Sequence, residues 1–559
     1  MVFLFLFIGA WGVALLGWGV IFQRLLGVSL EGWPHADRMA LGVLLGHIPV
    51  IGMGYLVHLA LPLSGWPSAL VFGVGWAIFL GRLPRSRPTW KTILLFAGVL
   101  AGVSLFCARP MVHGDTGGYH AQAILWLTEE PMIRGLANLM AVFGYNSSWW
   151  ILAAWMSWPF GAPVGAISVS GPLLVATGVL LCGACLRIFR REAEAADWFW
   201  LPAFYLWLRQ LVGLNTPSPT TDIPANLLVL VSLWLIVRGG RPNPFINRPE
   251  GRLFLALAFL AATAKLSASP LLAAGLLWLA VSWAVLFLGR QPGSASTVGF
   301  QVLHLLPLGV CGLAFLYHGW LLSGYPIFLT HLGESLAPPW QMPAWMVDFT
   351  LKRARNWAFT YGASAEAIQS TPAWKLWLYG QSGLTNLLIA GAAAGCAALG
   401  GLFLLKRWDL LQAGIRMVWL PASIAFLGLA WNLSQVPSLR FSSGFAFALL
   451  GCGFAIIGPH LPAFLSRISL VVWCLLCAVA LSKLAMGRPL SLLKPAPPPP
   501  PVDPVEHPTK QGFVIRVSTF PWFAPKPAVV ELEYDENLIV FRSPDGKILE
   551  MHSGRKKSY

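Results

Sequence analysis

The sequence has little charge for its length. Only 11% of its 559 residues are Asp, Glu, Lys or Arg, and 57% are hydrophobic, whereas an ordinary soluble domain has about a quarter charged residues. So few charges cannot cover the surface of a water-soluble protein of this size. The composition therefore excludes a soluble domain and predicts an integral membrane protein.

Several common functional signatures are also missing. The sequence contains no P-loop, no GxGxxG dinucleotide pattern, no zinc signature and no internal repeat. Eight cysteines are scattered along it, and the CxxC spacings Cys182/Cys185 and Cys474/Cys477 lie in apolar stretches without a nearby His or acidic residue. We interpret both pairs as packing thiols and predict no metal-ligating residues.

Long apolar runs make up most of the chain. A span needs about 20 mostly apolar residues, because the hydrocarbon core is about 30 Å thick. We predict about fourteen spans, at residues 2–23, 38–61, 67–82, 91–107, 163–188, 197–213, 222–238, 252–267, 270–289, 299–318, 383–405, 412–431, 441–458 and 468–485. The pair 252–267 and 270–289 can also be read as one bent helix, which would reverse the side of every later loop.

The basic residues predict an orientation. The net charge is +16, and most cationic residues gather in short loops. The positive-inside rule assigns such loops to the cytoplasm, so we do not interpret the charge as a sign of nucleic-acid binding. Alternation then places residues 108–162, 214–221, 319–382, 432–440 and everything after 485 on the outer side. These segments are the longer and chemically more varied ones, so we expect the chemistry at the outer face.

The predicted fold class is an all-α polytopic membrane protein with a small C-terminal β module. Its expected parts are N-terminal transmembrane helices (1–107), an outer loop with an interfacial helix (108–162), central transmembrane helices (163–318), an outer loop (319–382), C-terminal transmembrane helices (383–485), a Pro-rich linker (486–512) and the β module (513–559).

Two of these parts rest on local patterns. Residues 147–158 carry four tryptophans and are too short to span, which is typical of a helix in the headgroup zone. Residues 513–518, 529–534, 538–541 and 547–551 are typical of short strands. A stiff five-proline linker precedes them. We therefore expect a chain ending near Lys494 to remain a stable membrane protein.

The densest polar cluster is the run HGDTGGYHAQ at 113–122. A helix beginning near Gly118 would place Tyr119, Gln122 and Trp126 on one face, with Asp115 at its N-terminal edge. A carboxylate there can act as a general base toward a hydroxyl, and an indole can stack on a sugar ring. The alternative is that Asp115 or Thr116 only caps the helix.

Other outer segments supply charged candidates. Asp222 stands at the start of a predicted span, where an N-terminal helix position explains it equally well. Arg353, Arg355 and Arg440 offer planar donor forks suited to phosphate, although Arg440 at the mouth of a span can also extend to lipid headgroups. Lys265 is the one basic residue well inside an apolar run, near a predicted helix end.

Asp115 beside Tyr119, His120, Gln122 and Trp126, followed by the aromatic helix, resembles the GT-C superfamily of polytopic glycosyltransferases. The runs DTGGYHAQ (115–122), NSSW (146–149), SGYP (323–326) and RF (440–441) are also similar to an uncharacterised bacterial integral-membrane family. About three more helices precede the acidic loop than in GT-C enzymes, and Thr116 stands where those often have a second acidic residue.

The resemblance implies a glycosyltransferase that uses a polyprenyl-phosphate-linked sugar at the outer face of the bacterial inner membrane. It implies that Asp115 is catalytic, assisted by His113 or His120. Substrate would then be bound by the remaining candidates: Tyr119, Gln122, Trp126, Asp222, Arg353, Arg355 and Arg440. A divalent cation as cofactor is left open, the expected partners are the lipid-linked donor and membrane lipids, and the C-terminal module is expected outside.

Two other classes of function remain alternatives. A transporter or flippase of lipid-linked saccharides would need polar residues at mid-membrane depth and usually an internal repeat. A non-catalytic scaffold would explain the linker and the β module but not the cluster around Asp115. Polar residues that gather at the outer ends of the spans favour the enzyme.

Overall fold

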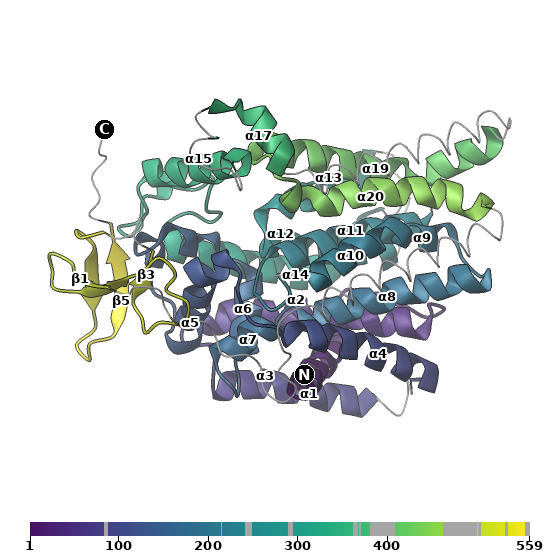
Figure 1. Ribbon diagram of the computed structural model, residues 1–559. Helices are drawn as coiled ribbons and strands as arrows, with labels where there is room; N and C mark the ends of the chain where they lie inside the picture. The colour runs from purple at the N-terminus through teal and green to yellow at the C-terminus, as the bar shows by residue number, and fades with distance from the viewer. Residues whose placement is uncertain are drawn as a thin grey trace.

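The structure is a computed structural model, and it describes residues 1–82, 88–213, 215–240, 249–288, 294–360, 367, 370–380, 408–461, 500, 505–530 and 535–553. Within these residues a bundle of helices carries a small β module at one end (Figure 1). The α-helices are α1 (Val2–Leu25), α2 (His35–His58), α3 (Trp66–Arg82), α4 (Trp90–Cys107), α5 (Ala121–Glu129), α6 (Ser148–Trp155), α7 (Ala162–Ser168), α8 (Gly171–Arg190), α9 (Ala195–Trp198), α10 (Trp200–Val212), α11 (Asp222–Gly239), α12 (Pro249–Ala264), α13 (Ser269–Leu288), α14 (Ser294–Ser323), α15 (Ala344–Thr360), α17 (Ala373–Gly380), α19 (Trp408–Gln435) and α20 (Leu439–Ile457).

Nine stretches of the described helices are long and apolar enough to cross a membrane. They coincide with nine of the predicted spans, so the prediction of a mostly helical chain with many membrane-length apolar helices is confirmed. The predicted spans 67–82, 197–213 and 252–267 correspond to the shorter helices α3, α10 and α12, of 17, 13 and 16 residues. The predicted spans 383–405 and 468–485 lie outside the described residues.

Glycines allow the first helices to approach one another closely. A Cβ atom on Gly19 of α1 would lie 1.8 Å from the carbonyl oxygen of Gly42 in α2. A Cβ atom on Gly17 would lie 1.9 Å from the carbonyl oxygen of Gly75 in α3. Because these distances leave no room for any side chain, the backbones pack directly against each other, as small residues permit in membrane helices.

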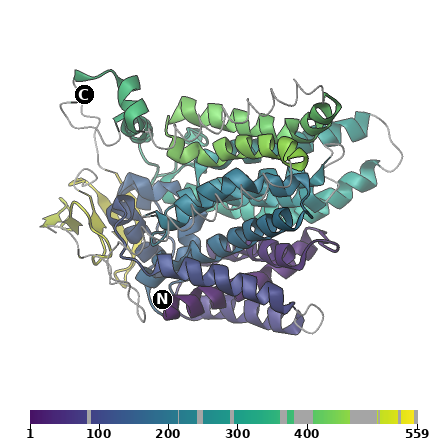
Figure 2. The same ribbon diagram turned by 45° about the vertical axis from the view of Figure 1, so that its right-hand side comes forward.

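The long helices run side by side between two ends of the bundle (Figures 1 and 2). At one end Arg187 pairs with Asp197 at 2.7 Å and with Asp37, in the first turn of α2, at 3.3 Å. His58 is the last residue of the same helix, about 32 Å from Asp37 along the helix axis for a rise of 1.5 Å per residue. We call the end with Arg187 the basic end and the end with His58 the loop end.

Residues 249–288 form two helices rather than one bent helix. Lys265 has extended backbone angles between α12 and a short 3-10 turn that leads into α13. A Cβ atom on Gly275 of α13 would lie 2.7 Å from the side chain of Leu255 in α12. The second helix therefore returns alongside the first, which keeps the alternation on which the predicted orientation depends.

The helix predicted at 147–158 is present as α6, and three of the four tryptophans of this segment face the protein interior; its position in the headgroup zone stays a prediction. Trp149, Trp150 and Trp155 are all buried inside the protein. The indole of Trp155 donates to the carbonyl of Val50, and that of Trp149 donates to the hydroxyl of Ser170. These partners satisfy the indoles of Trp149 and Trp155 inside the protein.

The C-terminal module consists of two small sheets at the loop end (Figure 1). The strands are β1 (Val505–Pro508), β2 (Val514–Val517), β3 (Ala528–Val529), β4 (Ile539–Arg542) and β5 (Ile548–His552), in the orders β1-β2-β3 and β4-β5. The module thus begins earlier than predicted, because β1 lies in the segment assigned to the linker. Part of the predicted strand 529–534 falls outside the described residues.

Candidate functional site

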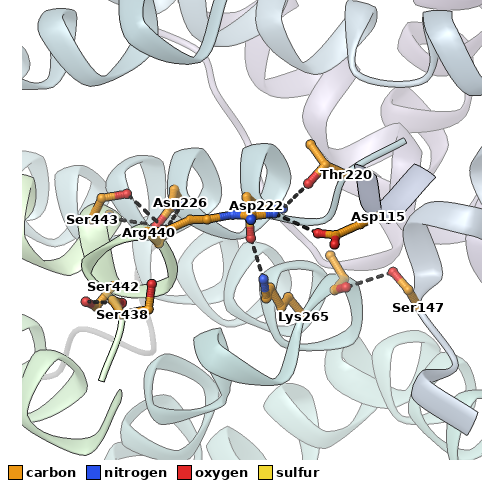
Figure 3. Close-up of polar contacts among 12 residues, drawn as sticks. Asp115, Ser147, Thr220, Asp222, Asn226, Lys265, Ser438, Arg440, Ser442 and Ser443 are labelled. Atoms are coloured by element: carbon orange, nitrogen blue, oxygen red, sulfur yellow. Dashed lines mark hydrogen bonds and ion pairs between the residues drawn. The ribbon is translucent and has the colours of Figure 1, made fainter. Parts of the chain in front are cut away.

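Asp115 lies at the loop end, in the segment that joins α4 to α5. The chain is helical from just before Asp115, with a π-helical turn over Thr116–His120 that continues into α5. In the described part of the chain the Asp115 carboxylate makes no capping hydrogen bond. It accepts instead from Nη2 of Arg440 at 3.0 Å (Figure 3), so capping alone does not account for this residue.

Arg440 connects two carboxylates that are far apart in the sequence. It lies in the first turn of α20, and its Nε donates to Asp222, the first residue of α11 (Figure 3). Asn226, one helical turn after Asp222, donates to the carbonyl of Arg440 at 3.0 Å and accepts from the backbone of Gly444 at 2.8 Å. This amide fixes the start of α20 against α11, which holds the guanidinium in place.

Lys265 completes the cluster. Its ammonium donates to the second carboxylate oxygen of Asp222, whose side chain is only 1% exposed. The NSSW segment supports this arrangement, because the hydroxyl of Ser147 donates at 2.7 Å to the carbonyl of Ala264, directly before Lys265. A buried carboxylate is stable when it is paired and hydrogen-bonded, and Asp222 has two cationic partners.

We call Asp115, Asp222, Lys265 and Arg440 the charge cluster. It is open on one side, because the side chains of Asp115 and Arg440 are 39% and 25% exposed. Burial acts to raise the pKa of the Asp115 carboxyl, but the Arg440 guanidinium outweighs it, so the pKa lies below its ordinary value. Asp115 is therefore ionised at neutral pH, and the two carboxylates balance the two cations.

The two candidate histidines lie behind Asp115. The Nδ1 atom of His113 is 4.0 Å from the Asp115 carboxylate, and the rings of His113 and His120 stack at 6.2 Å. Burial lowers the pKa of His113, and burial lowers that of His120 to about 3. Both imidazoles are therefore neutral at pH 7, and His113 is close enough to exchange a proton with Asp115 after a small movement.

Aromatic side chains flank the two cations. The ring of Phe441 lies 3.7 Å from the ammonium of Lys265, and Trp357 of α15 stacks on Phe441 at 6.0 Å. The guanidinium carbon of Arg440 is 5.7 Å from the Trp357 ring. Such cation–aromatic contacts stabilise the cations and leave the partly exposed Trp357 at the edge of the cluster.

The predicted face of Tyr119, Gln122 and Trp126 contacts protein. Gln122 donates to the carbonyls of Trp522 and Ala524 at 3.0 and 2.8 Å. Tyr119 lies edge-on to His120 and to Trp150, and Trp126 is buried. Gln122 and Trp126 therefore contact the C-terminal module, Tyr119 packs on rings of the loop and of α6, and the charge cluster is formed by other residues.

Arg353 and Arg355 lie on α15, the helix that brings Trp357 to the cluster. Arg355 is exposed and Arg353 is half-buried. One turn after Arg353, the ring of Trp357 contacts the guanidinium of Arg440. The structure thus brings Asp115, His113, Asp222 and Arg440 together, with His120 directly behind them.

Sequence reasoning missed several members of the site. Lys265 carried a usable signal, a basic residue within an apolar run, but its partner could not be named. Phe441 was noticed only as part of the RF motif, and Trp357 and Trp522 carried no signal, because isolated aromatic residues are frequent in this sequence. Among the residues that the structure describes, no three His, Cys, Asp or Glu side chains gather as they would around a metal ion.

Comparisons with curated proteins and with solved structures found no match. Residues 1–447 match a family described as Domain of unknown function (DUF8201). The matched region starts at the N-terminus and ends within α20, so it contains all four residues of the charge cluster. Since the match covers well over half of the sequence, the chain belongs to the DUF8201 family.

Proposed function

We propose that the protein is a GT-C-type membrane glycosyltransferase with about fourteen spans. It moves a sugar from a polyprenyl-phosphate-linked donor to an acceptor at the outer face of the bacterial inner membrane. The observation that carries the proposal is the charge cluster, in which Arg440 holds an ionised, partly exposed Asp115 beside a second cation, Lys265. A base and a phosphate-binding group are the two parts that this transfer requires.

In the proposed reaction an acceptor hydroxyl attacks the anomeric carbon of the donor sugar. The new C–O bond forms as the bond from the anomeric carbon to the phosphate oxygen breaks, and that oxygen keeps the electron pair. The hydroxyl proton passes to the Asp115 carboxylate. The products are the glycosylated acceptor and the polyprenyl phosphate.

Arg440 is suited to hold the leaving phosphate. A guanidinium has five N–H donors, and those on Nε and Nη2 contact Asp222 and Asp115. Among the described residues, Nη1 has no hydrogen-bond partner. Its two N–H groups are therefore available for a phosphate oxygen, where they would stabilise the charge that develops on the leaving group.

The charge balance favours a donor with one phosphate. Two carboxylates already neutralise Arg440 and Lys265, and the neighbouring histidines are neutral, because burial lowers the pKa of both His113 and His120. A sugar joined to polyprenol by one phosphate adds a single negative charge to this site. A diphosphate adds at least one more, for which the described residues offer no further cation at the cluster.

A flippase for lipid-linked saccharides is the alternative. It is less well supported, because the charge cluster lies where α11 and α20 begin and where α12 ends, at the loop end of the bundle. A transport path would need such groups at mid-membrane depth. A scaffold that displays the module is also less well supported, since the module packs onto the Asp115 segment.

The test uses purified protein in nanodiscs with a panel of polyprenyl-phosphate hexoses. The proposal predicts release of polyprenyl phosphate and appearance of the hexose on an acceptor or on water. In a parallel assay, the protein is placed in vesicles that carry the same lipids labelled with a fluorophore. Movement of the lipids between leaflets without breakage of the sugar–phosphate bond would contradict the enzyme and support the flippase.

A further inference from the structure

The C-terminal module lies outside the family match yet contacts the Asp115 segment. The match ends at residue 447, and the module begins at β1. Trp522, in the loop between β2 and β3, donates its backbone N–H to the carbonyl of Gly117 at 2.9 Å. A Cβ atom on Gly117 would lie 2.7 Å from the Trp522 ring, so a glycine two residues after Asp115 lets this indole seat against the loop.

A second set of contacts fixes the module about α5. The ammonium of Lys526 is 2.9 Å from Glu130 and 3.2 Å from Glu129, and it lies 4.6 Å from the ring of Trp126. Farther along the loop, Asn138 donates to the carbonyl of Met551 at 3.0 Å. Contacts at both ends of the loop hold the module in one orientation.

This orientation brings a partly exposed aromatic ring next to Gly114, the residue before Asp115. Phe520 is 37% exposed, and its ring edge lies 3.9 Å from the position of a Cβ atom on Gly114, the residue before Asp115. The ring of Trp522 supports it at a centroid distance of 6.5 Å. A partly exposed aromatic ring on the segment that carries a partly exposed carboxylate suits a sugar, because the ring can cover the C–H face while the carboxylate binds a hydroxyl.

We propose that Phe520 forms the acceptor subsite and that the acceptor is a saccharide. This inference rests on the proposed function, which supplies the donor and the role of Asp115. Phe520 selects acceptors whose sugar ring has an apolar face, and Trp522 and Gln122 are positioning residues that hold Phe520 beside the carboxylate. Trp357 lies on the other side of the cluster, where Arg440 is proposed to hold the donor phosphate.

The first experiment compares transfer to sugars with transfer to water. Wild type, Phe520→Ala, Phe520→Trp and the control Phe541→Ala receive polyprenyl-phosphate hexoses and a panel of octyl hexosides. Phe541 is an exposed ring of the same module, at 46%, and it packs on His552. We expect Phe520→Ala to lower the ratio of sugar to water transfer about three- to tenfold through a higher KM for the hexoside.

Phe520→Trp should restore that ratio, because an aromatic face is what the subsite requires, and Phe541→Ala should match wild type. An unchanged ratio in Phe520→Ala, or transfer to a serine peptide in preference to every hexoside, would overturn the saccharide subsite. If wild type leaves every donor intact, the proposed function fails.

A second experiment tests the saccharide subsite even if the protein cleaves none of the donors. Phe520 and, as the control, Phe541 are each replaced by p-benzoylphenylalanine, and cells are illuminated before the protein is purified. Mass spectrometry is expected to find hexose-containing adducts at position 520 and none at position 541. Adducts of lipid alone or of peptide, equal labelling at both positions, or the absence of any adduct would overturn the assignment.

Discussion

Arg440 donates to Asp115 at 3.0 Å, although 325 residues separate them in the sequence. The same guanidinium also bonds Asp222. The start of α20 is thereby fixed to the start of α11 and to the loop before α5. A single side chain near the end of the family match thus organises the candidate site, and its loss should affect both stability and activity.

The pair of Lys265 and Asp222 should be energetically coupled. Lys265→Met leaves a buried carboxylate with one cation fewer, and we expect a loss of about 3 kcal/mol in the free energy of unfolding. Asp222→Asn leaves Lys265 without its carboxylate. The double variant should therefore lose about 1–3 kcal/mol less than the sum of the single losses, as measured by unfolding in detergent.

An exposed ion pair provides the control for that cycle. Lys547 and Asp545 are 3.5 Å apart, and their side chains are 70% and 61% exposed. Lys547→Met and Asp545→Asn should show almost no coupling, because exposed pairs contribute little. If the Lys265/Asp222 cycle is additive as well, the buried pair does not hold the site together.

Removal of the C-terminal module should destabilise the protein. The sequence suggested that a chain ending near Lys494 would be stable, but the module donates to and accepts from the Asp115 loop. Gln122→Leu removes two hydrogen bonds between buried groups, and we expect it to lower the free energy of unfolding by about 1–3 kcal/mol. Truncation at Lys494 should lower it further and reduce accumulation in membranes.

Thermal unfolding in detergent checks both changes. Gln511→Leu, a change at an exposed amide of the same module, serves as the control, since Gln511 bonds only the backbone of nearby Val540 within the described structure. A truncated protein as stable as wild type would show that the contacts between module and loop are energetically unimportant.

Acid should destabilise the protein through His120. Burial lowers the pKa of His120 from 6.5 to about 3, so as pH falls through 6.5 the unfolded chain binds a proton that the folded protein does not. Stability then falls toward pH 3, with a slope of about 1.4 kcal/mol per pH unit at most. Arg440 lowers the pKa of Asp115 despite its burial. Asp115 therefore contributes a loss of stability only when the pH falls below the ordinary pKa of an Asp side chain.

His120→Gln should flatten the decline in unfolding temperature between pH 7 and pH 4.5. The control is His331→Gln, because the hydrogen bonds that this exposed imidazole donates to Asp348 and Glu334 raise its pKa. The stabilisation by His331 is present at low pH and lost as pH rises, so its pH dependence is opposite to that of His120. A His120→Gln variant with the acid sensitivity of wild type would contradict the buried neutral imidazole.

Labelling can test whether the loop end faces outward. Ser147, Ser218 and Ser323 lie in three segments that the sequence places on the outer side. All three are buried, so cysteines there would react poorly from either side. Val112 and Leu336 are exposed at the loop end, and Glu192 is exposed at the basic end. In a background without native thiols, Val112→Cys and Leu336→Cys should react with an impermeant reagent in intact cells, and Glu192→Cys only after permeabilisation. The reverse pattern would invert the orientation.

Much of the fold could be predicted because a membrane helix is a local feature. Its length and apolar composition can be read from about 20 consecutive residues, and the described helices follow the predicted spans closely. The environment of α6 could not be predicted, because its tryptophans suit a headgroup zone and a protein interior equally well. Burial is decided by neighbours such as Val50 and Ser170, which are distant in the sequence.

The site could be predicted only in pieces. Asp115, Asp222 and Arg440 were each selected from separate segments, and Lys265 was noticed as an unusual charge. Their joining depends on four segments that meet at the loop end, and no local pattern encodes those contacts. Gln122 shows the same limit, since its partners Trp522 and Ala524 lie 400 and 402 residues away.

The most direct test of the proposed enzyme is Asp115→Asn, assayed for sugar transfer from a polyprenyl-phosphate hexose in nanodiscs. Asn keeps the size of the side chain and can still accept from Arg440, but it cannot take a proton from a hydroxyl. Asp348→Asn is the control, because that carboxylate is 67% exposed and pairs with His331. We predict that Asp115→Asn accumulates normally and loses activity by roughly 10²-fold or more, with Asp348→Asn unchanged. Wild-type transfer by Asp115→Asn would contradict the catalytic role of Asp115.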